Sequence, residues 1–229
     1  MLFNMDCLEY MKTLEDNSIQ FIMADPPYLI SKKDNYGKGD SNLSKYRTDF
    51  GDWDYAEEEI ILLCIAEFKR ILKRGGSMII WYDWKKLTPL YQKIEDFKFK
   101  QIRLNSWVKK NAPPIGSNNS YLPNSKEFFI YCAKNTSYKK KWYKAPFNSS
   151  YDKGIYEYSI AGKSRIHPTE KPYKLMEEII LKHTNEGDLV YIPFAGSGVD
   201  IEVCINNDRE WLATEISKEY YDNILKRID

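Results

Sequence analysis

IQFIMADPPY, residues 19–28, is the stretch of this 229-residue chain that decides its fold. The apolar run Ile19–Ala24 stops abruptly at Asp25, which is typical of a short strand buried on both faces of a parallel sheet. In open α/β sheets, sites lie beyond the carboxyl ends of such strands. The stretch therefore predicts an α/β fold with a polar site immediately after residue 24.

The tetrapeptide Asp25-Pro26-Pro27-Tyr28 has a chemistry of its own. The two prolines fix φ twice and remove two backbone donors, so the nearby carbonyl groups lack local amide partners. A flat group bearing an NH2 fits this array, because Asp25 and the Pro26 carbonyl can each accept one amino hydrogen while Tyr28 stacks on the ring. The alternative is an ordinary strand-to-loop turn with an aspartate cap.

Apolar runs and amphipathic stretches alternate through the rest of the chain. Residues 55–72 have helical spacing, and the Gly75-Gly76 pair is expected to break this helix before the next strand. Further strands are expected at 78–82, 127–133, 188–192 and 211–214, and further helices at 172–183, 199–205 and after 214 through Ile228. This alternation predicts a mostly parallel sheet covered by helices on both faces. Residues 29–54 and 134–163 are polar and weakly patterned, and 29–54 is expected to be a long loop.

Composition places the chain among soluble globular proteins. Hydrophobic residues make up 43% and charged residues 29%, and no apolar run approaches the length of a membrane span. The N-terminus shows no signal-peptide pattern and the four cysteines form no closely spaced pair, so reduced thiols in a cytoplasm are expected. The two histidines have no metal ligand at useful spacing, so no metal site is expected.

The net charge of +1 conceals a strong asymmetry. Residues 97–151 hold eleven Lys and Arg and a single acid, Glu127, so this segment carries +10 and the rest of the chain −9. A basic block favours a polyanionic partner, because each Lys or Arg placed near a phosphate releases a counterion. A solvated basic face with no partner is the alternative. The best candidates for phosphate contact are Lys139, Lys140 and Lys141, followed by Lys109 and Lys110.

Two later motifs bear on ligand binding. The stretch Phe194-Ala195-Gly196-Ser197-Gly198 lies between a predicted strand and helix, where glycines let a ligand approach a helix N-terminus. Glu215 ends the next predicted strand, where an acid commonly binds ribose hydroxyls. The Rossmann dinucleotide fingerprint is not met, since no third glycine follows. The stretch 167–172, HPTEKP, indicates by itself only the start of a helix.

DPPY, HPTEKP and PFAGSG in this order resemble the permuted, beta-class-like DNA amino-methyltransferases, which modify N6 of adenine or N4 of cytosine. The resemblance covers nearly the whole chain, residues 4–228, apart from 29–54 and 134–163. It implies a single class I, Rossmann-like methyltransferase domain over residues 1–229, built as a three-layer α/β/α sandwich. It also implies a variable loop at 29–54 and a small basic target-recognition insertion at 110–166.

The resemblance also assigns roles to individual residues. The catalytic motif corresponds to Asp25, Pro26, Pro27 and Tyr28. Asp6 and Cys7 resemble the turn that contacts adenosine, and Lys171 resembles the segment at the methionine end of the cofactor. The implied cofactor is S-adenosylmethionine, and its contacts correspond to Asp6, Cys7, Asp25, Lys171, Phe194, Ala195, Gly196, Gly198 and Glu215.

One position departs from the pattern of the family. Relatives usually have Asp-Pro-Phe where this chain has Ile192-Pro193-Phe194, and Ile192 cannot accept a hydrogen bond from the ammonium group of the cofactor. Asp200, displaced but near the same helix N-terminus, is expected to bind the cofactor and to compensate in part. The alternative is a degraded cofactor site in a protein that binds DNA without methylating it.

The activity that the resemblance implies is site-specific transfer of a methyl group to N6 of a flipped-out adenine in double-stranded DNA. Aspartate at the head of the tetrapeptide favours adenine, while N4 of cytosine, or an RNA or protein substrate, stays open. The resemblance is compatible with a homodimer and with a cognate restriction endonuclease as partners, and with a cytoplasmic location in a prokaryotic or phage-infected cell.

Overall fold

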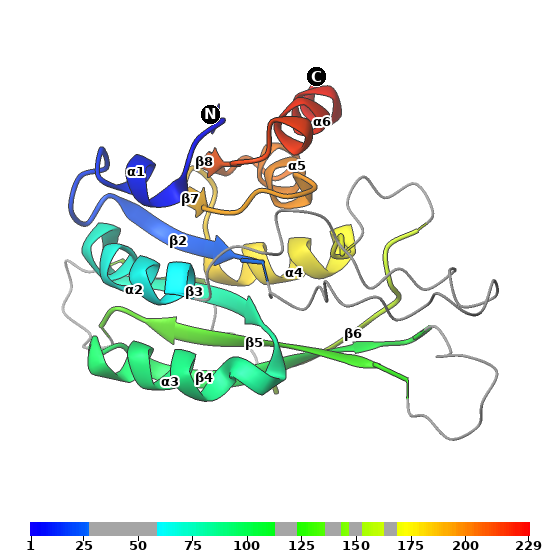
Figure 1. The fold of residues 1–229 in the computed structure, drawn as a ribbon, viewed down its shortest axis with the longest axis horizontal. Coiled ribbons are helices and arrows are strands. Elements are labelled where there is room, and N and C mark those ends of the chain that lie inside the picture. Colours follow the sequence, from blue (N-terminus) through cyan, green and yellow to red (C-terminus); the bar gives the residue numbers. More distant parts are fainter. Residues whose placement is uncertain (28–58, 113–122, 136–142, 147–152, 163–168) are drawn as a thin grey trace, which may run out of the picture.

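In the part of the chain that the structure describes, eight strands form one sheet at the centre of the fold (Figure 1). The computed structural model describes residues 1–27, 59–112, 123–135, 143–146, 153–162 and 169–229. Within these ranges the strand order is β1-β8-β7-β2-β3-β5-β4-β6, and β5 runs antiparallel to both of its neighbours while the other pairings are parallel. The strands are β1 (Leu2–Phe3), β2 (Ile19–Ala24), β3 (Leu72–Tyr82), β4 (Lys100–Lys109), β5 (Lys126–Ala133), β6 (Ile155–Tyr158), β7 (Leu189–Ile192) and β8 (Glu210–Thr214).

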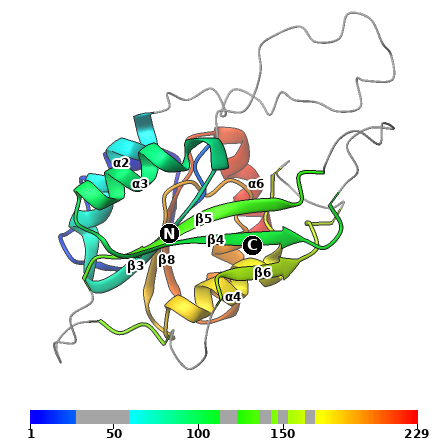
Figure 2. The ribbon, with the colours of Figure 1, turned by 90° about the horizontal axis from the view of Figure 1, so that it is seen from below.

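Helices cover both faces of this sheet (Figures 1 and 2). One face carries α1 (Cys7–Met11), α2 (Glu59–Ile71) and α3 (Leu87–Asp96), the last preceded by a 3-10 turn at Trp84–Lys86; the other carries α4 (Tyr173–His183), α5 (Val199–Asn206) and α6 (Lys218–Ile228). Successive side chains of a strand point to opposite faces, so Ile22 and Ala24 pack under the first set of helices, while Phe21 and Met23 pack under the second. The predicted three-layer sandwich is confirmed.

Most predicted elements are confirmed to within a residue or two. The strands β2, β5, β7 and β8 and the helices α4, α5 and α6 lie where the apolar pattern puts them. The predicted helix at 55–72 corresponds to α2, although 55–58 lies outside the described residues. The strand β6 falls within 134–163, where the sequence indicates only weak patterning. Among the helices of the described ranges, none combines the length and apolar character that crossing a membrane requires.

Gly75 and Gly76 are not the break between the predicted helix and the predicted strand at 78–82, because α2 already ends at Ile71. β3 begins at Leu72 and runs through both glycines. Its pairing with β2 is irregular here, since Ile19 pairs with Leu72 but Phe21 pairs with Ser77. Gly75 has a φ of +89°, and a Cβ at this position would lie 2.2 Å from the backbone oxygen of Tyr143. The glycines therefore allow a bulged strand and a close backbone approach.

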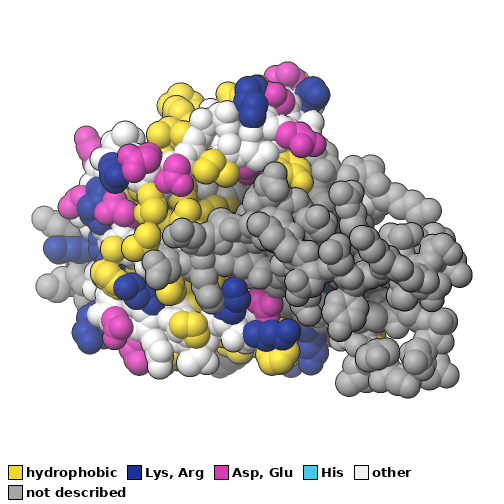
Figure 3. All heavy atoms as spheres, in the orientation of Figure 1, with side chains coloured by type: hydrophobic (Ala, Val, Ile, Leu, Met, Phe, Trp, Pro, Cys, Tyr) yellow, Lys and Arg dark blue, Asp and Glu magenta, His cyan; other side chains and the backbone are white. Residues whose placement is uncertain are grey.

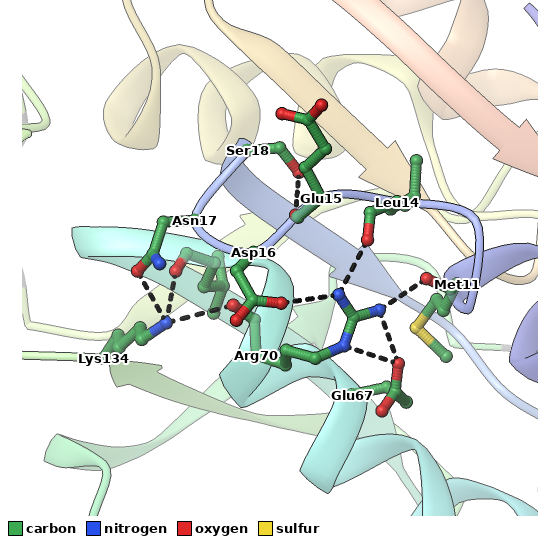
Figure 4. Close-up of polar contacts among 10 residues, drawn as sticks. Met11, Leu14, Glu15, Asp16, Asn17, Ser18, Glu67, Arg70 and Lys134 are labelled. Atoms are coloured by element: carbon green, nitrogen blue, oxygen red, sulfur yellow. Dashed lines mark hydrogen bonds and ion pairs between the residues drawn. The ribbon is translucent and has the colours of Figure 1, made fainter.

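The turn that leads into β2 is anchored at the amino end of this strand, opposite to the end that Asp25 follows. At the end of α2, the Arg70 guanidinium donates to the carbonyl oxygens of Met11 at 2.6 Å and Leu14 at 2.7 Å. Lys134, one of the basic-block residues, donates to Asn17 Oδ1 at 3.0 Å and to two backbone carbonyls (Figure 4). These bonds fix the amino end of β2, so the residue that follows its carboxyl end has a defined position.

Candidate active site

The carboxyl edge of the sheet brings together three of the predicted features. Asp25 follows β2, and the glycine loop at 194–198 follows β7, the parallel neighbour of β2. β4 ends at Lys109 on the same edge, where its antiparallel partner β5 begins and carries Glu127. Asp25, the glycine loop and the base of the basic segment therefore face one region of the molecule.

Lys171, from the HPTEKP stretch, lies at the centre of this region. Its Nζ is 2.7 Å from Asp25 Oδ2, 3.4 Å from Glu127 Oε2 and 5.0 Å from the centroid of the Trp81 ring. The Lys171 side chain is only 3% exposed. Burial alone would lower the pKa of Lys171, but the carboxylates of Asp25 and Glu127 outweigh it and raise the pKa above its ordinary value. The stretch thus supplies a buried ammonium to the predicted catalytic carboxylate, besides starting α4.

Asp200 is buried in the first turn of α5. Its Oδ1 has no hydrogen-bond partner among the described residues. Burial first, and the charge of Asp25 second, raise the pKa of Asp200 to about 7 against the opposing charges of Lys171 and Arg227. A buried carboxylate oxygen without a donor is costly, so Asp200 is a candidate acceptor for a cationic group of a ligand.

Glu215 holds the glycine loop from the end of β8. Its Oε2 accepts a hydrogen bond from the Gly196 amide at 2.8 Å, and its Oε1 accepts one from the Ser217 amide at 2.8 Å. Burial raises the pKa of Glu215, although these backbone bonds oppose it. No described atom lies within 4 Å of where a Cβ on Gly196 would stand. Open space beside a glycine loop and a carboxylate is suited to a bound ligand.

In the glycine loop, packing against α6 requires a glycine at position 198. Its φ is +77°, and a Cβ would lie 3.0 Å from Ile224 Cγ2. Gly198→Ala is therefore expected to lower the free energy of unfolding by about 1–3 kcal/mol, measured by urea denaturation. Gly187→Ala is the matched control, because its φ is +74° but no described atom lies within 4 Å of the Cβ position. Equal losses in the two variants would contradict a packing role for Gly198.

Asp6 and Cys7 lie where the chain enters α1. Asp6 caps that helix, because its Oδ1 accepts the backbone N–H groups of Leu8 at 2.8 Å and Glu9 at 3.2 Å. The Cys7 side chain is buried, with its sulfur 3.8 Å from that of Cys64. Both residues therefore shape the turn, and their contact with a cofactor stays a prediction. In the glycine loop itself, Phe194 is half-buried and Ala195 is buried.

The predicted DNA-contacting lysines are placed unequally. Lys109 is engaged within the protein, since its Nζ is 2.7 Å from Glu127 Oε1 and its side chain is 12% exposed. Lys110 is exposed at the same edge. On the described part of the face in Figure 3, basic and acidic side chains are interspersed. The predicted residues Tyr28, Lys139, Lys140 and Lys141, and the first two residues of the HPTEKP stretch, His167 and Pro168, lie outside the described residues.

Three residues complete the site without having been assigned a role from sequence: Glu127, Trp81 and Arg227. Arg227 on α6 donates to the Ser197 carbonyl at 3.1 Å and pairs with Glu170 and Glu202, which ties α6 to the glycine loop. The available signal for Glu127 was its position as the single acid of the basic block. Among the described residues, no three His, Cys, Asp or Glu side chains gather in a way that could hold a metal ion.

Known proteins resemble this chain in sequence and in fold. Residues 19–226 match the family model N6_N4_Mtase, described as DNA methylase. The type II methyltransferase M.HpaI of Haemophilus parainfluenzae is 29% identical over a gapped alignment of 242 positions, which covers 98% of this chain and 72% of the relative. The DNA adenine methyltransferase YhdJ of Escherichia coli (strain K12) is 28% identical over a gapped alignment of 250 positions, which covers 98% of this chain and 81% of the relative.

Among solved structures, the crystal structure of the M1.HpyAVI–SAM complex superposes with a TM-score of 0.72 at 26% identity, covering 100% of this chain and 98% of that one. The fold, the residues gathered at the carboxyl edge of the sheet and the family match over most of the sequence agree. This chain belongs to the DNA methylase family.

Proposed function

We propose that this protein transfers a methyl group from S-adenosylmethionine to N6 of adenine in double-stranded DNA. The observation that carries the proposal is the position of the buried Lys171. Its ammonium contacts Asp25, and its positive charge also opposes the burial that raises the pKa of Asp200 beside the glycine loop. The catalytic carboxylate and the cofactor loop can thus serve one reaction. The aspartate at the head of the tetrapeptide and the relative named as a DNA adenine methyltransferase support adenine. The order of the motifs supports the permuted class.

The residues at this edge fit S-adenosylmethionine, which presents a ribose diol, an ammonium group and a sulfonium. Glu215 offers a carboxylate to the diol, Gly196 offers open space, and Asp200 offers a buried oxygen to the ammonium. Ile192 is wholly buried in the core and is not available for that role. When bound, the cofactor supplies an electrophilic methyl group. The remaining proposed contacts are Asp6, Cys7, Asp25, Lys171, Phe194, Ala195 and Gly198.

Asp25 acts on the base. An exocyclic amine is a poor nucleophile, because its lone pair is delocalised into the ring. Hydrogen bonds from the amino hydrogens to Asp25 and to the Pro26 carbonyl favour a pyramidal nitrogen, and they strengthen as positive charge develops. Lys171 holds one carboxylate oxygen of Asp25 and so orients it. The base must leave the duplex to reach this carboxylate, and Tyr28 is proposed to stack on it.

DNA binding is proposed for the basic segment. Lys110, Lys139, Lys140 and Lys141 are suited to phosphate contact, which positions a duplex without specifying its sequence. Residues 110–166 are proposed to recognise the target and 29–54 to form a variable loop. The relatives named as type II methyltransferases support a cognate restriction endonuclease, and a homodimer also stays a prediction.

Methylation of a genomic library by the purified protein, followed by modification mapping and mass spectrometry of the digested DNA, tests this function. We expect N6-methyladenine at one defined sequence. N4-methylcytosine would instead assign the target to cytosine. Methylation of RNA or protein in place of DNA, or no transfer at all, would contradict the proposal; the second outcome would support the degraded cofactor site that Ile192 motivates.

Asp200→Asn is expected to weaken the binding of S-adenosylmethionine about tenfold, because the variant offers no charge to the ammonium group. Since the pKa of Asp200 is raised to about 7, its ionised form gains population from about pH 6 to about pH 8. The affinity of the wild type should therefore increase over this range, and that of the variant should not. Titration calorimetry measures both, with the exposed Asp96→Asn as control. Equal affinities in Asp200→Asn and wild type would remove Asp200 from the cofactor site.

A further inference from the structure

Four side chains of alternating charge form a row that ends at the catalytic carboxylate. Lys109 Nζ lies 2.7 Å from Glu127 Oε1, Glu127 Oε2 lies 3.4 Å from Lys171 Nζ, and Lys171 Nζ lies 2.7 Å from Asp25 Oδ2. These residues come from β4, β5, the turn before α4 and the turn after β2. Segments far apart in the sequence thus converge on one electrostatic unit with two positive and two negative groups.

Lys171 depends on both of its carboxylates. An ammonium at 3% exposure loses most of its hydration, and one ion pair compensates for this loss only in part. The charged groups around Lys171 are Asp25 after β2, Glu127 on β5 and, at longer range, Asp200 on α5. Burial would raise the pKa of Glu127, but the ammonium groups of Lys171 and Lys109 outweigh it and lower the pKa below its ordinary value. Glu127 is therefore an anion that Lys109 and Lys171 stabilise together.

We propose that Glu127 is a positioning residue for methyl transfer, which holds Lys171 in place on Asp25 while Lys109 holds Glu127. This inference rests on the proposed function. An ammonium shared between two carboxylates directs separate N–H bonds to each of them, so its position is fixed from two sides. Without the charge of Glu127, Lys171 keeps its attraction toward Asp25 and Asp200 but loses the attraction from the side of β5, and the carboxylate that receives the amino group loses its defined orientation.

The row also connects Asp25 to the proposed recognition segment. Lys109 and Glu127 lie on the two paired strands that precede and follow residues 113–122 in the sequence. Exposed Lys110 and Lys126 are their direct neighbours in the chain. A shift of this strand pair when DNA binds would therefore move Glu127, and with it Lys171 and Asp25.

Glu127→Gln keeps the shape of the side chain and removes its charge. We expect kcat to fall about 10- to 100-fold, as for a small misplacement of a reacting group, with the calorimetric affinity for S-adenosylmethionine unchanged within about twofold. The alkaline limb of the kcat profile should move to lower pH, because Lys171 loses one of the two carboxylates that keep it protonated. Glu127→Asp retains the charge and should recover part of kcat and the alkaline limb.

Glu178→Gln is the matched control. Glu178 on α4 also pairs with a lysine, Lys182, and accepts a hydrogen bond from Tyr158, but neither partner belongs to the row. Its substitution therefore breaks a comparable ion pair and should leave kcat and its pH profile unchanged. If Glu127→Gln fails to fold, Lys109→Met serves as the second variant, with an expected loss in kcat of about three- to tenfold. In the double variant Lys109→Met/Glu127→Gln, the Lys109 substitution should add nothing, because it acts through Glu127.

Two outcomes would overturn the inference. In the first, Glu127→Gln has the kcat and pH profile of the wild type. In the second, Glu127→Gln and Glu178→Gln lose kcat equally and at every pH, which is the result of a purely structural role. Absence of methyl transfer by the unmodified protein would be a different failure, because it would overturn the proposed function itself.

Discussion

Asp25→Asn is expected to lower kcat for methyl transfer by at least about 10²- to 10³-fold, with the affinity for S-adenosylmethionine reduced far less. Asparagine has nearly the same shape, but its amide offers the amino group one neutral acceptor in place of a carboxylate. The hydrogen bond that strengthens as the nitrogen becomes positive is therefore weakened where it matters most, in the transition state. Tritiated-methyl transfer under single-turnover conditions measures this step without a contribution from product release.

The same substitution also removes the carboxylate that lies 2.7 Å from Lys171, so some loss of stability is expected as well. Asp188→Asn separates the two effects. Asp188 is buried, and its Oδ2 accepts hydrogen bonds from the Tyr143 hydroxyl and the backbone N–H of Asn185, both at 2.6 Å. It precedes β7, so it lies at the end of the strands opposite to the site. That variant should lose stability and keep kcat per folded molecule. An Asp25→Asn protein with more than about a tenth of the wild-type rate would show that the carboxylate is not essential.

The part of the fold that could be predicted is the part whose residues are buried on both sides. β2 and β7 are continuous apolar runs between two layers of helices, so pattern and position agree. By contrast, β4 buries only Trp107, and the rest of its sequence is polar or half-exposed, so no apolar run marks it. The role of Gly75 in β3 could not be predicted from local sequence, because it depends on the backbone of Tyr143, about 70 residues away.

The residues of the candidate site also differ in whether they could be predicted from the sequence. Asp25, Gly196 and Glu215 follow the strands at which parallel-sheet topology places ligands, and that rule needs only the strand positions. The pairing of Lys109 with Glu127 depends on the register of β4 against β5, where Trp107 lies opposite Glu127. The register between two strands that are separated by a long connection cannot be predicted from local sequence. Charge counting predicts Lys109 as a candidate for phosphate contact but cannot show its ion pair with Glu127.

Lys171→Met is expected to lower the free energy of unfolding by about 3–5 kcal/mol near neutral pH, because it leaves two partly buried carboxylates facing each other without their shared cation. Methionine fills much of the same volume and can still lie against the Trp81 ring, so the loss reports mainly the charge. Chemical denaturation followed by circular dichroism measures it. Lys174→Met, three residues further along and 71% exposed, is the matched control and should leave the free energy of unfolding nearly unchanged.

The difference in the free energy of unfolding between the wild type and Lys171→Met should depend on pH in a defined direction, which a simple packing defect would not cause. In the wild type the pKa of Glu127 is lowered, so its contribution to stability is present above the pKa of the unfolded chain and is lost as the pH falls through the folded value. Without Lys171, burial acts on Glu127 with only Lys109 to oppose it, and its pKa rises. The folded variant then takes up protons more readily than the wild type, so the difference in stability should narrow as the pH falls from about 7 to about 5. Adding Glu127→Gln to Lys171→Met should recover part of the loss at neutral pH, because it removes one of the two carboxylates that have lost their shared cation. A difference that stays constant with pH, or a double variant less stable than Lys171→Met alone, would mean that Lys171 supports the fold through packing and not through its charge.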